Sequence, residues 1–260
     1  THGVAMRDFP FGGQTKIAYT QDANLHALEV TDLESRSTRA TARFFNGSKP
    51  EYPRRMLCIQ GSDAHRLTRD PKEITRLGIG DRVTEIKLSE PGFEDIREVF
   101  ESNDFALVRP YRRKDEPFDF VATAREQGAN IVQSFHERLS RQGGRQHAVL
   151  SDVVAFANTN GGTIYLGAGI RPGPPTGVDE VTETIAELRE EIERKVTPVL
   201  EVEIDALESQ GRQVVRIQVP EGPDKPYCLE DSRIYLRHEA ETALAVRDEI
   251  VQIVRKAFIQ

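Results

Sequence analysis

Residues 152–169, DVVAFANTNGGTIYLGAG, decide the fold. In the first part of this stretch, VVAFA, apolar residues recur at the i, i+1, i+3 and i+4 positions of a buried helix face. The segment NTNGG at 158–162 ends that helix, because Asn and Gly tolerate the left-handed backbone of a helix C-cap. The β-rich run TIYL at 163–166 follows and is closed by glycines. The stretch therefore predicts a buried helix, a tight polar turn and a central strand.

The chain after this stretch contains both helical and strand periods. Apolar residues recur along one face of 181–196, which predicts an amphipathic helix. Apolar and acidic residues alternate over 199–207, which predicts a half-buried strand joined through a hairpin turn to a partner strand at 214–219. Further expectations are a helix over 147–158, a turn between two strands at 171–177, a strand at 234–237, a closing helix at 245–258, and either strand or helix over 130–139.

The chain before this stretch shows shorter patterns. Residues 1–24 have little periodicity, whereas strands are expected at 25–31, 54–59 and 82–88, and helices at 33–45 and 93–100. A charged segment that ends in proline, RRKDEP at 112–117, is the best candidate for a linker. We therefore predict two α/β units, at 1–113 and 119–260, with a linker at 114–118.

Composition excludes several classes of protein. The chain has 260 residues, of which 38% are hydrophobic and 30% charged, as is typical of a globular protein with a polar surface. It has neither an apolar run of roughly 20 residues, which a membrane helix needs, nor a signal-peptide pattern. Its two cysteines, Cys58 and Cys228, fit no metal-binding spacing and are expected to be reduced thiols, so we predict a cytoplasmic protein.

The net charge and the first residues bear on partners. A net charge of −7 argues against extensive wrapping by nucleic acid and leaves room for a local basic patch. The chain begins with Thr-His-Gly and no initiator Met, which we interpret as a piece of a longer protein whose N-terminal part would be a partner of this segment. Self-association into a homo-oligomer is a further expectation.

Asp63 and His65 follow a predicted buried strand. In extended backbone, residues i and i+2 project to the same side, so a carboxylate and an imidazole can converge there on one divalent ion such as Zn, Mn or Fe. The alternative is a loop capped by the aspartate, with a histidine on the surface. The pattern alone leaves both interpretations open.

The surroundings of this pair resemble a known family. The segment LCIQGSDAHRL at 57–67, followed by LG at 77–78, VTEIKL at 83–88 and FEDIR at 93–97, is similar to the C-terminal end of the PHP phosphoesterases. The resemblance implies the last part of a distorted β/α barrel, with Asp63 and His65 as catalytic metal ligands and His2 as a third ligand. The family's initial His-x-His pair and its other ligands are absent from the chain, so the resemblance implies an incomplete site.

The opening stretch resembles a second family. VAFANTNGG, followed by a strand and glycine, is similar to the signature of the Schlafen AlbA_2 domain, and the later segments VTP at 196–198, KPY at 225–227 and YLR at 235–237 agree in order. The resemblance covers about residues 119–258 and implies binding of DNA or RNA. Glu126 fits the family's first acidic position, but the triplet at 131–133, IVQ, offers no second carboxylate, which favours binding over cleavage.

Candidate nucleic-acid-binding residues follow from this resemblance. Arginine contacts phosphate through two parallel hydrogen bonds, and backbone N–H groups of glycine-rich turns also bind anions. For each arginine the alternative is a solvated surface charge, and for the NTNGG turn it is a structural role. The candidates are Arg141, Arg145, Asn158, Thr159, Asn160, Arg171 and Arg237.

These patterns predict a segment of a bacterial-type multidomain protein that acts on nucleic acid. Its second unit would bind DNA or RNA, and its first would belong to a metal-dependent phosphoesterase (hydrolase) that is inactive as this segment alone. Two alternatives stay open: a non-catalytic module that binds nucleic acid or nucleotide, and an AlbA_2-type nuclease.

Overall fold

The computed structural model describes residues 13–35, 40–49, 51–102, 104–112, 118–139 and 144–257. The chain divides into two units. Unit 1 comprises Thr1–Glu101 and Val108–Glu116, and unit 2 comprises Ser102–Leu107 and Pro117–Gln260. Residues 114–117 of the predicted linker lie outside the described residues.

Unit 1 contains short elements. Strands β1 and β2 are parallel, with Leu28 opposite Cys58, and β3 and β4 are antiparallel, with Glu85 opposite Arg109. The Glu85 and Arg109 side chains form a cross-strand ion pair at 2.8 Å. In the described residues these two pairs close no barrel. The elements are α1 (Gly13–Gln21), β1 (Ala27–Glu29), α2 (Thr41–Phe44), β2 (Leu57–Ile59), β3 (Thr84–Ile86), α3 (Phe93–Glu101) and β4 (Val108–Pro110).

The helix predicted over 33–45 is much shorter in the structure. Only Thr41–Phe44 is helical among its described residues, and its N-cap residue, Ala40, makes no side-chain capping hydrogen bond. The Asp32 carboxylate accepts hydrogen bonds from the backbone N–H and the hydroxyl of Thr41, at 2.8 and 3.1 Å. Helix α1, conversely, lies where no periodicity predicted an element.

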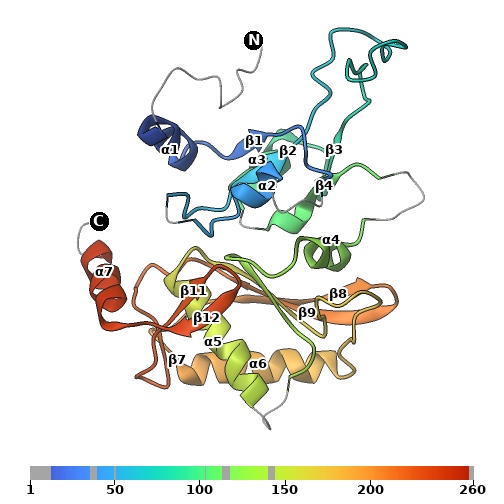
Figure 1. Cartoon of the computed structure of the whole chain (residues 1–260). Coiled ribbons are helices and arrows are strands. Elements are labelled where there is room, and N and C mark those ends of the chain that lie inside the picture. The colour runs from blue at the N-terminus through green and yellow to red at the C-terminus, as the bar shows by residue number, and fades with distance from the viewer. Residues whose placement is uncertain are drawn as a thin grey trace. The chain divides into compact units, whose positions relative to one another are not determined.

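Unit 2 is built on a four-stranded sheet in the order β5-β6-β9-β8 (Figure 1). Strands β5 and β6 are parallel, and the other neighbours are antiparallel, so the sheet is mixed, and unit 2 is an α/β unit as predicted. The elements are η2 (Phe105–Leu107), α4 (Phe120–Gln127), β5 (Gln133–His136), α5 (Arg145–Asn158), β6 (Gly162–Leu166), α6 (Val181–Lys195), β7 (Val196–Thr197), β8 (Glu203–Ser209), β9 (Arg212–Val219), β10 (Cys228–Leu229), β11 (Tyr235–His238), β12 (Glu241–Leu244) and α7 (Arg247–Ala257).

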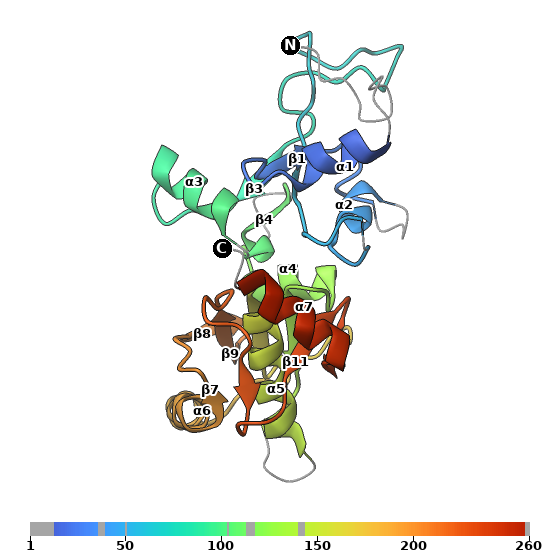
Figure 2. The same ribbon diagram turned by 90° about the vertical axis from the view of Figure 1, so that its left-hand side faces the viewer.

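Helices cover both faces of this sheet. Ile164 and Leu166 of β6 point to one face and join a core formed with α5 and α6, whereas Tyr165 points to the other face and packs with residues of α4 and η2. Figure 1 shows α5 and α6 on one side of the sheet and α4 on the other, and Figure 2 shows β11 beside α5. Strand β6 is buried along its whole length, as the opening stretch predicted.

The NTNGG turn depends on its two glycines. Gly161 has a φ of 69°, and a Cβ there would lie 2.8 Å from the backbone nitrogen of Glu221. A Cβ on Gly162 would lie 2.7 Å from both the Phe156 ring and the carbonyl oxygen of Val132. The glycines therefore allow α5 to reverse directly into the buried strand β6.

In three other segments the structure differs from the predicted secondary structure or decides between two predicted elements. The ambiguous segment 130–139 contains strand β5, which pairs with β6. The strand expected at 199–207 starts later, at Glu203, where pairing with β9 begins. The segment 171–177 leads from β6 toward α6 and does not join two strands.

Arg216 of β9 forms ion pairs with both Asp205 of β8 and Asp104, the residue before η2. These ion pairs anchor η2 on the sheet.

Candidate nucleic-acid interface

A pocket of about 380 Å³ opens where β5 ends. Strands β5 and β6 are parallel, so their carboxyl ends lie at the same edge of the sheet, and the N-terminus of α5 also contributes to the pocket. This edge is where ligands bind in α/β sheets. The residues that line the pocket are Phe135, His136, Glu137, Arg138, Arg145 and Thr176.

Three exposed arginines lie in the segments around this edge. Arg138 and Arg145 line the pocket, and Arg171 belongs to the loop after β6 that also contains Thr176. None of the three forms an ion pair with a described residue, in contrast to Arg109 and Arg216, for example. Their charges therefore face solvent and remain available to an anion.

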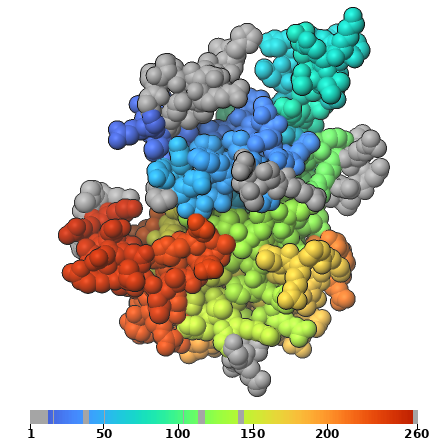
Figure 3. Space-filling view, in the orientation of Figure 1, coloured from blue at the N-terminus to red at the C-terminus, as the bar shows by residue number. Residues whose placement is uncertain are grey.

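The loop after β6 is held in place by Arg125 of α4. Its guanidinium donates to the carbonyl oxygens of Gly169 at 2.6 Å, of Gly173 at 2.7 Å and of Arg171. In Figure 3 this loop belongs to the yellow surface. That surface lies against the green surface, which is formed by residues that precede the loop in the sequence. Arg125 thus fixes the backbone that presents Arg171.

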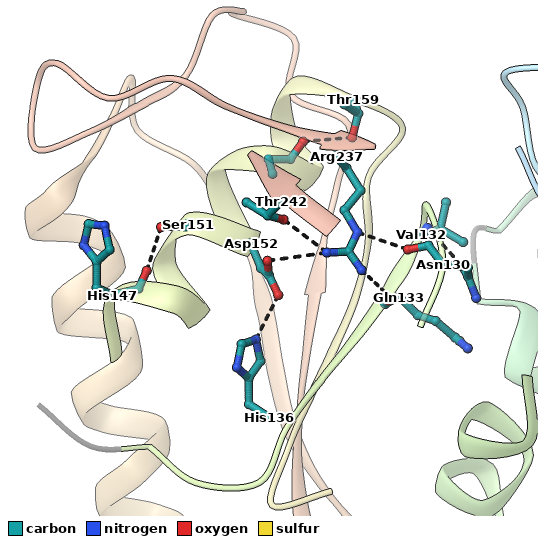
Figure 4. A network of polar contacts seen from close by, with 11 residues as sticks. Asn130, Val132, Gln133, His136, His147, Ser151, Asp152, Thr159, Arg237 and Thr242 are labelled. Atoms are coloured by element: carbon teal, nitrogen blue, oxygen red, sulfur yellow. Dashed lines mark hydrogen bonds and ion pairs between the residues drawn. The ribbon is translucent and has the colours of Figure 1, made fainter. Parts of the chain in front are cut away.

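A buried polar network lies behind the pocket (Figure 4). His136 Nε2 lies 2.8 Å from Asp152 Oδ2, and Asp152 Oδ1 lies 3.6 Å from Arg237 Nη1. The same Arg237 nitrogen donates to the Thr242 hydroxyl at 3.1 Å. Asp152 and Arg237 are 6% and 5% exposed, so both charges are removed from water and compensate each other.

Arg237 also joins several elements. Its Nε and Nη2 donate to the backbone carbonyls of Asn130 and Gln133, at 3.1 and 3.0 Å. Its guanidinium lies over the Phe156 ring, 5.1 Å from the centroid. The side chain predicted to contact nucleic acid is therefore buried and bound within the fold.

The ionisation of Asp152 follows from this environment. Burial alone raises the pKa of the Asp152 carboxyl, but the hydrogen bond and charge of His136, with the hydroxyl of Thr242, outweigh it and hold that pKa below its ordinary value. Burial lowers the pKa of Arg237, and the charges of Asp152 and Glu241 oppose that shift.

Asp152→Asn is expected to destabilise unit 2 in a pH-dependent way. Because the folded-state pKa of Asp152 is depressed, its ionised form stabilises the fold above the unfolded-state pKa of about 3.9, and this contribution is lost as pH falls through the folded-state value. We expect a loss of about 2 kcal/mol at pH 7 that becomes smaller as the pH falls below the unfolded-state pKa of about 3.9. Urea unfolding of both proteins at pH 7, 5 and 3 measures it; a pH-independent difference would contradict this assignment.

The Asn158 side chain is also used inside the fold. Its Nδ2 donates to the carbonyls of Tyr227 and Tyr235, at 2.8 and 3.0 Å, and its Oδ1 accepts from the Tyr227 N–H at 2.7 Å. Thr159 donates to the carbonyl of Ala155, and Asn160 is half-buried in the turn. This geometry agrees with the structural role that was the alternative for the turn.

The predicted metal ligands lie in unit 1. Asp63 and His65 follow β2, their side chains are exposed, and His65 Nε2 lies 3.9 Å from Asp63 Oδ1. His2 lies outside the described residues, as does Arg141 of unit 2. Among the residues that the structure describes, no three or more His, Cys, Asp or Glu side chains form a group that could hold a metal ion.

The structure also shows the residues at the two acidic positions that the Schlafen AlbA_2 resemblance implies ahead of α5. Glu126 is exposed on α4, and Gln133 is buried, with its amide bound to the carbonyls of Ala124 and Gly128. Glu137 is the acid that lines the pocket.

The sequence patterns did not identify four residues of the site: Arg138, Arg125, His136 and Asp152. Placing the end of β5 at His136 would have put residues 137 and 138 at the sheet edge, whereas no pattern in the sequence indicates the role of Arg125.

The comparison with protein families agrees with the resemblance to the Schlafen AlbA_2 domain that was predicted for unit 2. Residues 133–245 match the model of the family Schlafen, AlbA_2, so the resemblance of this segment is confirmed. Among solved structures, the chain is similar to the DIP2311 protein from Corynebacterium diphtheriae, with 21% identity and a TM-score of 0.38. That match covers 48% of this chain and 27% of the other. No curated protein matches the chain. None of the described helices is long and apolar enough to cross a membrane.

Proposed function

We propose that unit 2 binds nucleic acid through the sheet edge at the ends of β5 and β6. The observation on which this rests is the grouping of Arg138, Arg145 and Arg171 in the segments around that edge, exposed and without ion pairs to described residues. The match to Schlafen, AlbA_2 supports a nucleic-acid-related function for the same segment.

The charge distribution favours a local contact. The chain has a net charge of −7, so its average field repels a polyanion. Arg138 and Arg145 at the pocket and Arg171 in the loop after β6 form no ion pair with a described residue. Their charges can outweigh that repulsion locally, because salt screens the charges that lie more than about 8–10 Å away. The proposed interface is therefore short, and it contacts a few phosphates.

Binding is favoured over cleavage within this unit. A metal-dependent nuclease needs several carboxylates around its ions. Among the described residues that line the pocket, Glu137 alone has a carboxylate. The buried Gln133 belongs to the triplet 131–133, where the Schlafen AlbA_2 resemblance implies a second carboxylate. A non-catalytic binding module is therefore the function that the described residues of unit 2 support best.

The triple variant Arg138→Gln, Arg145→Gln, Arg171→Gln is expected to bind nucleic acid at least about tenfold more weakly at 50 mM salt, since each arginine lost removes a phosphate contact. Fluorescence anisotropy with single- and double-stranded DNA and RNA measures this and identifies the preferred strand type. Arg255→Gln, an exposed arginine of α7, is the matched control. Unchanged affinity in the triple variant would refute the interface.

A second candidate function concerns unit 1. Asp63 and His65 lie side by side after β2, a member of a parallel pair, and their oxygen and nitrogen donors suit Zn, Mn or Fe. We propose that they bind a divalent ion within a PHP-like phosphoesterase site, to which further ligands must be added. The ion would supply a Lewis acid and an activated water, and unit 2 would supply nucleic-acid binding.

Metal content tests this second candidate. In a protein that contains the complete site, we expect stoichiometric metal to be retained after dialysis and Asp63→Ala to lose it, as measured by elemental analysis. In a protein that contains the complete site, Asp63→Ala should also abolish phosphoester hydrolysis. Hydrolysis equal to that of the wild type would exclude the role of Asp63.

A further inference from the structure

We propose that the pocket at the end of β5 binds a terminal phosphate monoester, presented by the end of a nucleic acid or by a mononucleotide. This inference rests on the proposed function, because the same edge of unit 2 would bind the rest of the strand. It adds that the pocket distinguishes a phosphorylated end from a hydroxyl end.

The size of the pocket favours an end group over a continuous strand. Its volume of about 380 Å³ lies near the lower limit of small-molecule sites, which is about 300 Å³. Such a volume accommodates a phosphate and part of one nucleoside. A strand that passes through needs an open groove on both sides of the phosphate.

The charge of the lining favours a doubly charged phosphate. Arg138 follows the end of β5 and Arg145 is the first residue of α5, so the two cations come from different elements. Both are exposed, and neither forms an ion pair with a described residue. A phosphate monoester has nearly two negative charges at neutral pH, and forked guanidinium donors match its oxygens.

His136 and Thr176 supply further polar groups. His136 lines the pocket, and its Nε2 lies 2.8 Å from Asp152 Oδ2, so Nδ1 is the ring nitrogen left for a ligand. The buried Asp152 fixes the orientation of the ring from behind. Helix α5 begins after Gly144, which has no side chain to cap the first turn, and its N-terminus adds a favourable dipole.

Glu137 opposes an anion in this pocket. It is the carboxylate of the lining, and its side chain lies against Gly169, where a Cβ would be 2.8 Å from Oε1. Two arginines against one glutamate still leave a positive pocket. Removing the glutamate should therefore strengthen the preference for phosphate, which a purely structural role of these residues does not predict.

Two labelled oligonucleotides that differ only in a 5′-phosphate or a 5′-hydroxyl test the proposal, with a 3′-phosphate probe as a second arm. We expect at least one phosphorylated end to bind about tenfold more tightly than the hydroxyl end. Arg138→Gln and Arg145→Gln should each remove most of this preference, and Glu137→Gln should increase it. Arg171→Gln, outside the pocket lining, should weaken all probes equally.

Competition with a nucleoside monophosphate separates the two sources of the phosphate. Displacement of the phosphorylated probe by the free nucleotide shows that a mononucleotide suffices, and displacement by phosphorylated oligonucleotide alone shows that the end of a strand is required. Equal binding of phosphate and hydroxyl ends overturns the inference while leaving the proposed function intact. If no oligonucleotide binds and calorimetry shows no binding of the nucleoside monophosphate, both fail.

Discussion

Replacing Arg237 with methionine is expected to destabilise unit 2 by about 3–5 kcal/mol. The change leaves the Asp152 carboxylate buried without its cation, and it removes the donors to the carbonyls of Asn130 and Gln133. It also removes the cation from the face of Phe156. Urea denaturation followed by far-UV circular dichroism measures the loss, as a fall in the unfolding midpoint of unit 2.

Two controls make this result specific. Arg255→Met, on the exposed surface of α7, should change the free energy of unfolding by less than about 0.5 kcal/mol. Asp152→Asn combined with Arg237→Met should cost less than the sum of the two single changes, because the two charges compensate each other. Additive costs, or a cost below about 1 kcal/mol for Arg237→Met alone, would show that the buried pair does not stabilise the fold.

Asn158→Ala is expected to destabilise unit 2 by about 3 kcal/mol or more. The asparagine makes three buried hydrogen bonds, to the backbone carbonyls of Tyr227 and Tyr235 and from the N–H of Tyr227. An alanine leaves these three backbone groups without that partner in a site from which water is excluded. Thermal unfolding with a matched urea series measures the effect.

Thr159→Ala is the matched control for Asn158. The Thr159 hydroxyl donates to the carbonyl of Ala155 within the same helix, a local bond that contributes little to stability. We expect a cost below about 1 kcal/mol. Equal costs at the two positions would mean that the Asn158 amide is not the structural centre of the turn.

The sequence predicted the centre of unit 2 well, because the patterns there are local. The helix over 147–158 and the strand over 163–166 were predicted from apolar spacing and from the NTNGG stop, and α5 and β6 confirm both. Helix α4 was missed, although Asp119, whose side chain accepts from the Ala122 N–H, and Gly128 mark its two ends. Its capping residues could have indicated it.

The site was less predictable, because burial depends on contacts between distant segments. Arg237 was predicted to contact nucleic acid, and Asn158 either to contact nucleic acid or to hold the turn. The partners of both side chains lie about seventy residues or more away in sequence and bury them. Arg145 and Arg171 do lie exposed, as predicted. Arg138 was missed because its position at a strand end becomes visible only once β5 is known to pair with β6.

The salt dependence of nucleic-acid binding tests the central claim most directly. The logarithm of the association constant of wild-type protein should fall linearly with the logarithm of salt concentration between about 50 and 200 mM. In the variant that lacks Arg138, Arg145 and Arg171, the slope should become shallower by about 2–3, since each phosphate contact contributes about 0.9. An identical slope in the two proteins would contradict binding through these arginines.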